Sequence, residues 1–254
     1  AEKHPHYFAK LGPNQGRGLS CGFWFNFGGN TCVSLNVNFD GTVGIVEGNP
    51  DIGGSRASIS QMAAEELGIP LDKIRTIIAD TNSLGHNDVT DGSRVTFAVG
   101  LATIKAAKAA KKEMCKRAAK LWGIDEDAVY WENGFAIPSG PNASDQDPLS
   151  FEKIASMSGQ TGGPIAGHYE VNAEGAGVSF GVHLVDVEVD PETGHTKILR
   201  YTVFQDAGKA IHPSYVEGQM QGGSVQGIGW ALNEEYIYDT NGKLQNPGFL
   251  DYRI

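Results

Sequence analysis

The sequence predicts an α+β fold, in which helices and β-hairpins are interleaved without the regular strand–helix–strand rhythm of a parallel sheet. Apolar positions along residues 213–232 recur with helical spacing, and the alanine-rich stretch 94–122 predicts a second, longer helix. Asp40-Gly41 and Asn133-Gly134 each lie between two short apolar runs, which is a strong signal for a β-hairpin. Mixed sheets with packed helices follow from these observations.

The first part of the chain is expected to form a hairpin that leads directly into a glycine-rich loop. Residues 1–16 read as an irregular lead-in. Along residues 31–48 apolar and polar positions alternate on both sides of Asp40-Gly41, so two antiparallel strands are predicted there.

A helix is predicted over residues 57–68, directly after that loop. Ser55 or Ser58 can cap its start, and Gly68 is a residue that commonly ends a helix. Residues 73–80 then predict a short strand.

The middle of the chain alternates loops with short elements. Lysines gather toward the carboxyl-terminal end of the 94–122 helix, as the helix dipole favours, and they read as a solvated face. The expected elements around it are a polar loop at 81–93, a hairpin at 128–138, a turn at 141–148, a helix at 149–158 capped by Ser150, and a loop that ends as a strand at 159–170.

Residues 177–208 carry the strongest β signal, with two apolar runs on either side of a D-P-E-T-G turn. The apolar parity changes between Leu184 and Val185, which a bulge or a strand buried on both faces would explain. A hairpin-like segment around Asn241-Gly242 follows the glycine-rich helix. We expect one region over 1–254, divided into lobes at 1–160 and 161–254.

Composition excludes several classes of function. The formal net charge of −10 argues against binding to a nucleic-acid backbone, and the apolar runs are too short to span a membrane. Three cysteines without C-x-x-C spacing indicate neither a disulfide framework nor a zinc site, so a cytoplasmic location is expected. The chain reads as a piece of a longer protein or one subunit of a split assembly.

The predicted helix at 213–232 contains five glycines, although each interior glycine costs about 0.5–1 kcal/mol relative to alanine. Close approach by another backbone or by a ligand would offset that cost. Gln219 and Gln226 lie on one face with Gly222 and Gly223 between them, so a large polar ligand could lie on the glycines and bond to the amides. A tight helix–helix contact is the other interpretation.

Two loops share one design, because G-S-R precedes a predicted helix in each. Glycine, a hydroxyl, a guanidinium and a helix start together suit phosphate or another anion, although ordinary capping explains either loop alone. Neither loop has the spacing of a Walker loop or of a dinucleotide fingerprint. The candidate binding residues are Gly53, Gly54, Ser55, Arg56 and Ser58 in the first loop, and Ser93, Arg94 and Thr96 in the second.

No standard catalytic motif is predicted: H-E-x-x-H does not occur, and G-V-S-F-G at 177–181 lies inside the predicted β run, not at the strand-to-helix turn of a nucleophile elbow. His183 lies in the β run and is expected to be a satisfied strand residue, and His212 is expected in a loop or cap. His86 lies in a polar loop and is the histidine to test first. Asp206 and Glu217 flank the glycine helix and can equally be a turn residue and a dipole partner.

Taken together, five segments resemble the molybdenum hydroxylase family, the xanthine dehydrogenase and aldehyde oxidase group, in the carboxyl-terminal half of the molybdopterin-binding large subunit. The most specific segments are 178–194 and 205–254, and the second contains D-x-G-x-x-I-x-P followed by E-G-Q-x-x-G-G-x-x-Q-G-x-G. The resemblance is carried by G-R-G at 16–18 and by the stretches 49–74, 90–107, 178–194 and 205–254.

The resemblance implies molybdopterin with molybdenum, in the cytosine dinucleotide form common in bacteria. It implies that the two loops contact the pterin or dinucleotide, that Phe180 and Gly181 lie beside the cofactor, and that Gln219, Gly222, Gly223 and Gln226 line the pterin. The pterin would hold the metal, so no protein metal ligand is expected. The implied chemistry is water-derived hydroxylation of an aldehyde, N-heterocycle or related small molecule, with electrons leaving through iron–sulfur and FAD-containing flavin subunits.

Two departures from the family pattern stand out. The first loop reads G-G-S-R-A-S where the family has G-Q-G followed by threonine, and the family's catalytic glutamate would follow the end of this chain. No catalytic residue is therefore assigned, and the rest of the molybdenum subunit is an expected partner. The alternatives are a non-catalytic, cofactor-free binding or assembly module of the same fold, and an unrelated nucleotide-binding protein built on the G-S-R loops.

Overall fold

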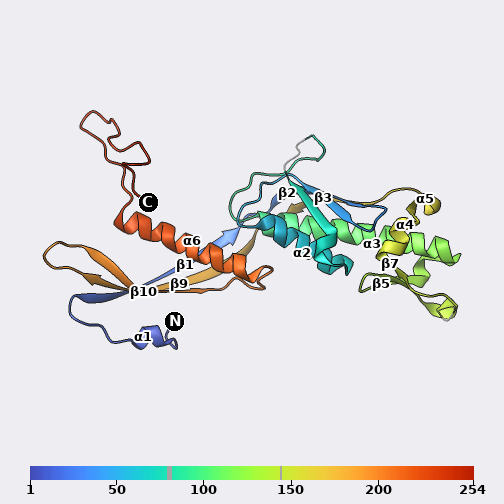
Figure 1. The fold of residues 1–254 in the computed structure, drawn as a ribbon, viewed down its shortest axis with the longest axis horizontal. Helices are drawn as coiled ribbons and strands as arrows, with labels where there is room; N and C mark the ends of the chain where they lie inside the picture. Colours follow the sequence, from blue (N-terminus) through green and yellow to red (C-terminus); the bar gives the residue numbers. More distant parts are fainter. Residues whose placement is uncertain (79–81, 144) are drawn as a thin grey trace. The chain divides into compact units, whose positions relative to one another are not determined.

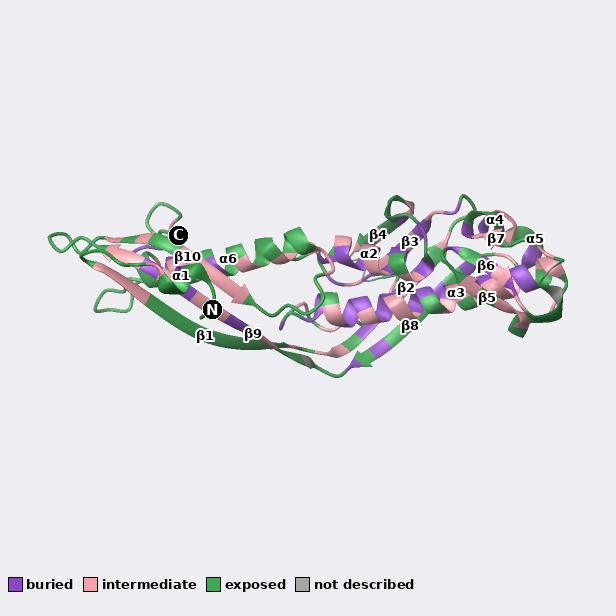
Figure 2. Cartoon of the chain, turned by 90° about the horizontal axis from the view of Figure 1, so that it is seen from below, coloured by how far each residue is buried: buried purple, intermediate pink, exposed green. Residues whose placement is uncertain are grey.

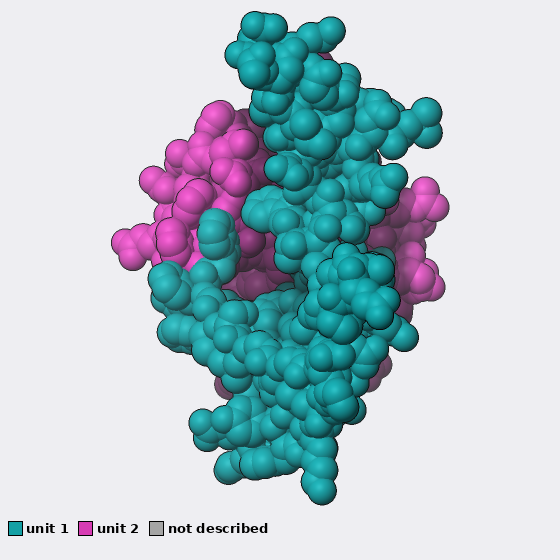
Figure 3. Space-filling model, turned by 90° about the vertical axis from the view of Figure 1, so that its left-hand side faces the viewer, with its two compact units in different colours: residues 1–24, 178–254 teal, residues 25–177 magenta. Residues whose placement is uncertain are grey.

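A computed structural model describes residues 1–78, 82–143 and 145–254 (Figure 1). The chain forms two compact units. Unit 1 comprises residues 1–24 and 178–254, and unit 2 comprises residues 25–177 (Figure 3). These bounds differ from the lobes expected at 1–160 and 161–254, because the first residues of the chain pair with its carboxyl-terminal part. Three small sheets with packed helices in the described residues confirm the α+β class.

Unit 2 is built on a four-stranded sheet in the order β4-β3-β2-β8. The predicted hairpin is confirmed, since β2 (Gly29–Val37) and β3 (Val43–Glu47) pair antiparallel around Asp40-Gly41. β4 (Ile74–Ile78) runs parallel to β3, which α2 (Ser55–Leu67) and the 3-10 turn η1 (Leu71–Lys73) make possible by carrying the chain back. The strand predicted at 73–80 is confirmed to Ile78, and Ala79 and Asp80 lie outside the described residues.

The long alanine-rich helix is confirmed, with one added feature at its start. Residues Val95–Val99 form a π-helical turn, η2, and α3 (Gly100–Trp122) continues from it. α3 packs on β8 (Ile165–Ala173) so closely that a Cβ at Gly167 would overlap the main-chain carbonyl of Ala106. Small side chains on α3 therefore set the spacing between helix and sheet.

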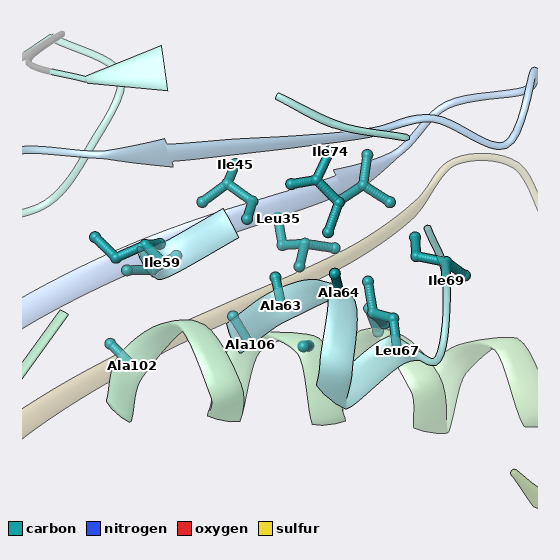
Figure 4. Close-up of a cluster of buried hydrophobic side chains, with 14 of the residues drawn as sticks. Leu35, Ile45, Ile59, Ala63, Ala64, Leu67, Ile69, Ile74, Ala102 and Ala106 are labelled. Carbon is teal, nitrogen blue, oxygen red and sulfur yellow. The ribbon is translucent and has the colours of Figure 1, made fainter. Parts of the chain in front are cut away.

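The core of unit 2 lies between this sheet and the helices α2 and α3. Figure 4 shows side chains of α2 meeting those of the strands and of α3. Leu35 and Ile45 from the strands and Ile59 and Leu67 from α2 are fully buried. Burial of each such aliphatic side chain stabilises the fold by about 1.5–3 kcal/mol.

A second, smaller sheet completes unit 2. As predicted, β5 (Val129–Glu132) and β6 (Phe135–Pro138) form a hairpin around Asn133-Gly134, and Ser150 caps α4 (Phe151–Ser156) by accepting a bond from the Lys153 N–H at 3.2 Å. The remaining elements are η3 (Glu126–Ala128), η4 (Gly140–Asn142), β7 (Leu149–Ser150) and α5 (Ser158–Thr161).

Unit 1 contains a three-stranded sheet in the order β1-β9-β10. β9 (Ala176–Val189) and β10 (Thr196–Gln205) form the predicted hairpin. A bulge between Leu184 and Val185 is wrong, because both residues pair in regular register; the irregularity lies instead in β10, where Leu199 has no partner across from Val187 and Asp186. The expected irregular lead-in is wrong in part, because α1 (Pro5–Phe8) forms a short helix before β1 (Gln15–Asn26).

A buried ionic network explains why α1 forms. Asp186 on β9 accepts bonds from Nε of Arg17 at 2.7 Å and from Nη2 at 2.9 Å, and His6 Nε2 lies 3.1 Å from the same carboxylate. The His6 ring also meets the Thr202 hydroxyl at 2.7 Å. These contacts tie α1, β1, β9 and β10 together, although the residues are distant in sequence.

α6 (Pro213–Leu232) has the predicted bounds, with proline in its first turn. Figure 2 shows most of the helix as exposed. The hairpin-like segment around Asn241-Gly242 is confirmed by a bridge between Tyr238 and Leu244. Among the described residues, no helix combines the length and apolar character needed to cross a bilayer.

Candidate functional site

The first G-S-R loop leads into α2 through two left-handed glycines, Gly53 (φ 65°) and Gly54 (φ 77°). The expected serine cap is wrong, because Gly54 occupies the cap position and no side chain caps the helix there. Ser55 is instead the first helical residue, and its buried hydroxyl has no hydrogen-bond partner among the described residues. An unpaired buried hydroxyl is costly, so this helix start has unused hydrogen-bonding capacity.

Arg56 is the exposed cation of this loop. Its Nε lies 3.2 Å from Asp51 Oδ2, and its main-chain N–H donates to Asp51 Oδ1 at 3.1 Å. Its side chain is 53% exposed. An anionic ligand could therefore reach the guanidinium but would meet Asp51 beside it. Asp51 is not among the candidate residues that the sequence predicts. A carboxylate just before a predicted helix start is the pattern that would have indicated it.

The second loop has the same tripeptide and a related backbone. Gly92 (φ 60°) and Ser93 (φ 59°) are both left-handed, and the Gly92 N–H donates to Asp91 Oδ1 at 2.7 Å. Serine adopts this conformation only at an energetic cost, which is a frequent property of ligand-binding loops. The Ser93 and Thr96 residues are exposed at the start of η2, and π-helical turns are frequent at functional sites.

Arg94 differs from Arg56 in a way that the shared tripeptide does not reveal. It is 2% exposed, and its guanidinium donates to the carbonyl oxygens of Gly28 (2.7 Å), Asn30 (2.9 Å) and Asp88 (3.0 Å) and to the Thr31 hydroxyl. Burial lowers the pKa of this guanidinium, and Asp88 partly offsets the effect. The side chain holds the second loop against β2, so its guanidinium is already occupied.

The structure brings the two loops together within unit 2. The Asn49 side-chain amide, just before the first loop, donates to the Thr90 hydroxyl at 2.7 Å and to the Asp88 carbonyl at 3.1 Å, just before the second. Glu47 Oε2 in turn accepts a bond from the Asn49 N–H at 2.7 Å. Burial raises the pKa of Glu47 to about 7, against the effect of that N–H. The two helix starts are thus joined by a buried polar link.

The candidate residues on α6 lie on its exposed surface in unit 1. Gln219, Gly222, Gly223 and Gln226 are all exposed. A Cβ added at Gly218, Gly222, Gly223 or Gly227 would meet no atom within 4 Å. Within the described parts of unit 1, no second helix packs on this flank, so the glycines are not offset by an internal helix contact.

Phe180 and Gly181 lie at the start of the long hairpin of unit 1. Phe180 is 59% exposed, its ring centroid is 6.5 Å from that of Phe23, and its carbonyl accepts a bond from the Asp206 N–H at 2.9 Å. Gly181 is buried beside the Gln205 side chain. This arrangement places an exposed aromatic ring at one end of the sheet.

The structural expectations for His183 and His212 are confirmed. His183 bonds to the Tyr201 hydroxyl at 3.0 Å across the hairpin, which confirms a satisfied strand residue. His212 occupies the cap position of α6 and stacks on Tyr215 at 3.7 Å. His86 pairs with Asp88 at 2.9 Å on the surface.

The chain matches a family model described as the molybdopterin cofactor-binding domain, over residues 7–254. It is 32% identical over 231 residues to the nicotine 6-hydroxylase large subunit of Paenarthrobacter nicotinovorans, covering 87% of this chain and 28% of that protein. It is 29% identical over 258 residues to the xanthine dehydrogenase molybdenum-binding subunit of Escherichia coli O157:H7, covering 94% of this chain and 33% of that one.

The fold is also shared with a solved structure. A reconstituted CO dehydrogenase from Oligotropha carboxidovorans superposes with a TM-score of 0.82 at 23% identity, over 94% of this chain and 32% of the other. The chain therefore spans about a third, or less, of the length of the proteins it matches.

Proposed function

Because the chain belongs to the molybdopterin cofactor-binding domain family, we propose that it supplies part of the cofactor cradle of a molybdenum-dependent hydroxylase or dehydrogenase. The proposed cofactor is the cytosine dinucleotide form of molybdopterin. When bound, it would supply the metal chemistry for water-derived hydroxylation of an aldehyde, an N-heterocycle or a related small substrate. The residues of this chain would bind and orient it.

The exposed glycine flank of α6 carries this proposal. A flat surface without β-carbons admits a planar heterocycle, and the Gln219 and Gln226 amides can donate to and accept from its polar edge. The free-energy cost of the glycines is then offset by the ligand. The flat glycine surface and the two flanking amides therefore fit a pterin.

The two loops are proposed to hold the phosphate-bearing part. The loop at 53–58 offers the exposed Arg56 guanidinium and the unpaired Ser55 hydroxyl, and the loop at 93–96 offers exposed Ser93 and Thr96. Arg94 would contribute by holding its loop in place, since its guanidinium is occupied internally. Phe180 is proposed to lie beside the cofactor, with Gly181 behind it.

The remaining part of the molybdenum subunit, an iron–sulfur subunit and an FAD-containing subunit are the proposed partners. The chain spans 28% and 33% of two large-subunit relatives, and another relative is named as subunit gamma of a dehydrogenase complex. No catalytic residue is assigned to this chain, so a general base would come from elsewhere in the assembly. Three free cysteines are consistent with the proposed cytoplasmic location.

The test is to purify the natural assembly and identify the small molecules released on denaturation by mass spectrometry, with assays of molybdenum and phosphorus. Gln219→Ala and Gln226→Ala are expected to lower the molybdenum content. Gln221→Ala is the matched control, because Gln221 is an exposed glutamine on another face of the same helix. Equal molybdenum content in all three variants would contradict the α6 cradle.

A second function is a cofactor-free binding or assembly module of the same fold. The internally occupied Arg94 and the G-G-S sequence in place of G-Q-G favour it. It predicts an assembly that contains this chain in folded form but holds neither pterin nor molybdenum.

A further inference from the structure

Four polar side chains gather on the face of the β2–β8 pair that points away from α3. The register places Cys32 opposite Glu170 and Ser34 opposite His168. Residues of the other parity face the helix: Val33 and Leu35 are fully buried in the core. Two neighbouring rungs of one sheet therefore present a thiol, a hydroxyl, an imidazole and a carboxylate together.

Three of these groups have the spacing of ligands to one metal ion. Cys32 Sγ lies 3.6 Å from His168 Nε2, and that nitrogen lies 3.6 Å from Glu170 Oε1. All three ligand atoms lie within 4.8 Å of one another. With zinc–sulfur and zinc–nitrogen bonds of about 2.3 and 2.0–2.1 Å, tetrahedral geometry separates sulfur from nitrogen by about 3.6 Å. The side chains thus need little rearrangement to enclose an ion.

The fourth side chain orients the histidine. The Ser34 hydroxyl lies 2.9 Å from His168 Nδ1, so Nδ1–H can donate to it and leave the Nε2 lone pair directed at the cysteine and the glutamate. Metal-binding histidines are usually held in this way, with the second ring nitrogen donating to an oxygen. Ser34 is a positioning residue in this arrangement.

We propose that Cys32, His168 and Glu170 form a binding site for a divalent transition-metal ion of the zinc type. A thiolate with an imidazole and a carboxylate suits zinc, whereas calcium and magnesium prefer oxygen ligands alone. The Cys32 side chain is buried, but those of His168 and Glu170 are 54% and 72% exposed, so an ion can enter from solvent. Three protein ligands leave the fourth position to water.

Gly85 belongs to a loop that lies beside Cys32 and Glu170. A Cβ there would lie 3.4 Å from both Cys32 Sγ and Glu170 Oε1. The Asn87 side chain of the same loop accepts a bond from the Cys32 N–H at 3.1 Å. This loop therefore lies against the Cys32 side of the site.

The full 254-residue chain, prepared with reduced thiols and without metal, provides the test. Zinc is titrated in competition with a chromophoric chelator, and cobalt(II) is used as a spectroscopic probe. We expect one equivalent of metal per chain and a thiolate-to-cobalt charge-transfer band. Cys32→Ser should remove the band and weaken zinc binding more than tenfold, and Ser34→Ala should weaken it by about tenfold.

Cys21→Ser and Cys115→Ser are the matched controls and should keep both the band and the affinity, because neither cysteine belongs to such a group in the described residues. Glu170→Gln replaces an exposed side chain, so it tests the site even if Cys32→Ser does not fold. Unchanged zinc affinity in Glu170→Gln, or a cobalt band that survives Cys32→Ser, would overturn the proposal.

Discussion

The Nε of Arg94 donates a hydrogen bond to the carbonyl oxygen of Gly28 at 2.7 Å, across 66 residues of sequence. This bond is one of four that the buried guanidinium makes with residues 28–31 and with the loop before η2. A G-S-R tripeptide that reads as a ligand-binding loop therefore serves first as an internal brace.

Arg94→Met is expected to destabilise the fold by about 3 kcal/mol or more, because it leaves buried carbonyl oxygens without donors. Arg56→Met, in the other G-S-R loop, should change stability by less than about 1 kcal/mol, because that side chain is exposed and makes a surface ion pair. Urea unfolding followed by tryptophan fluorescence measures both. Similar losses in the two variants would contradict the different roles of the loops.

Glu47 predicts a pH-dependent stability. Its pKa is raised from 4.5 to about 7 in the folded chain, so the folded state holds the proton more tightly than the unfolded state does. The contribution of Glu47 to stability is therefore fully present below about pH 4.5 and is lost as the pH rises through 7, about 3 kcal/mol in total. Glu47→Gln keeps an acceptor for the Asn49 N–H and should remove this slope. Melting temperatures measured from pH 4 to pH 8 would show it, and parallel curves for the two proteins would refute it.

Asp186 predicts the opposite sign in unit 1. The Arg17 guanidinium, with help from His6, lowers the pKa of this carboxyl from 3.8 to about 2. Its contribution to stability is present above pH 3.8 and is lost as the pH falls through 2. Asp186→Asn should therefore destabilise the chain at pH 7 and make little difference near pH 2. Glu192→Asn, in the exposed turn of the same hairpin, is the control and should leave the loss of stability at low pH unchanged.

Gly167→Ala tests the close packing of α3 on β8. The added methyl group would overlap the Ala106 carbonyl, so a loss of about 1–3 kcal/mol is expected. Gly44→Ala in β3 of the same sheet is the matched control, because a Cβ there meets no atom within 4 Å. Denaturant midpoints compare the two, and equal midpoints would show that the helix can move away at no cost.

Replacing a glycine of α6 by alanine should raise the stability of the chain and lower cofactor binding in the natural assembly. Gly222→Ala adds a methyl group in open space, so it should stabilise the chain by about 0.5–1 kcal/mol through helix propensity. In the natural assembly the same methyl group would intrude on the proposed pterin surface and lower the molybdenum content. A variant that is more stable and equally rich in molybdenum would separate the glycines from cofactor binding.

Local sequence determined most of the secondary structure. Hairpins at Asp40-Gly41 and Asn133-Gly134, the Ser150 cap and the bounds of α6 all follow from turn chemistry, capping and periodicity. Because these rules act over a few residues, the structures they produce can be predicted from the sequence alone. The family motif in residues 205–254 was likewise readable directly.

Only the tertiary structure decided what the polar side chains do. Nothing within a few residues of Arg94 indicates that carbonyls of Gly28 and Asn30 would surround it, and Cys32 shows no metal-site spacing until β8 brings His168 and Glu170 to its side. The α1 helix depends in the same way on Asp186. Such partners are distant along the chain, so the free energy of burying a charge or aligning ligands is set by packing between strands, which the local pattern does not encode.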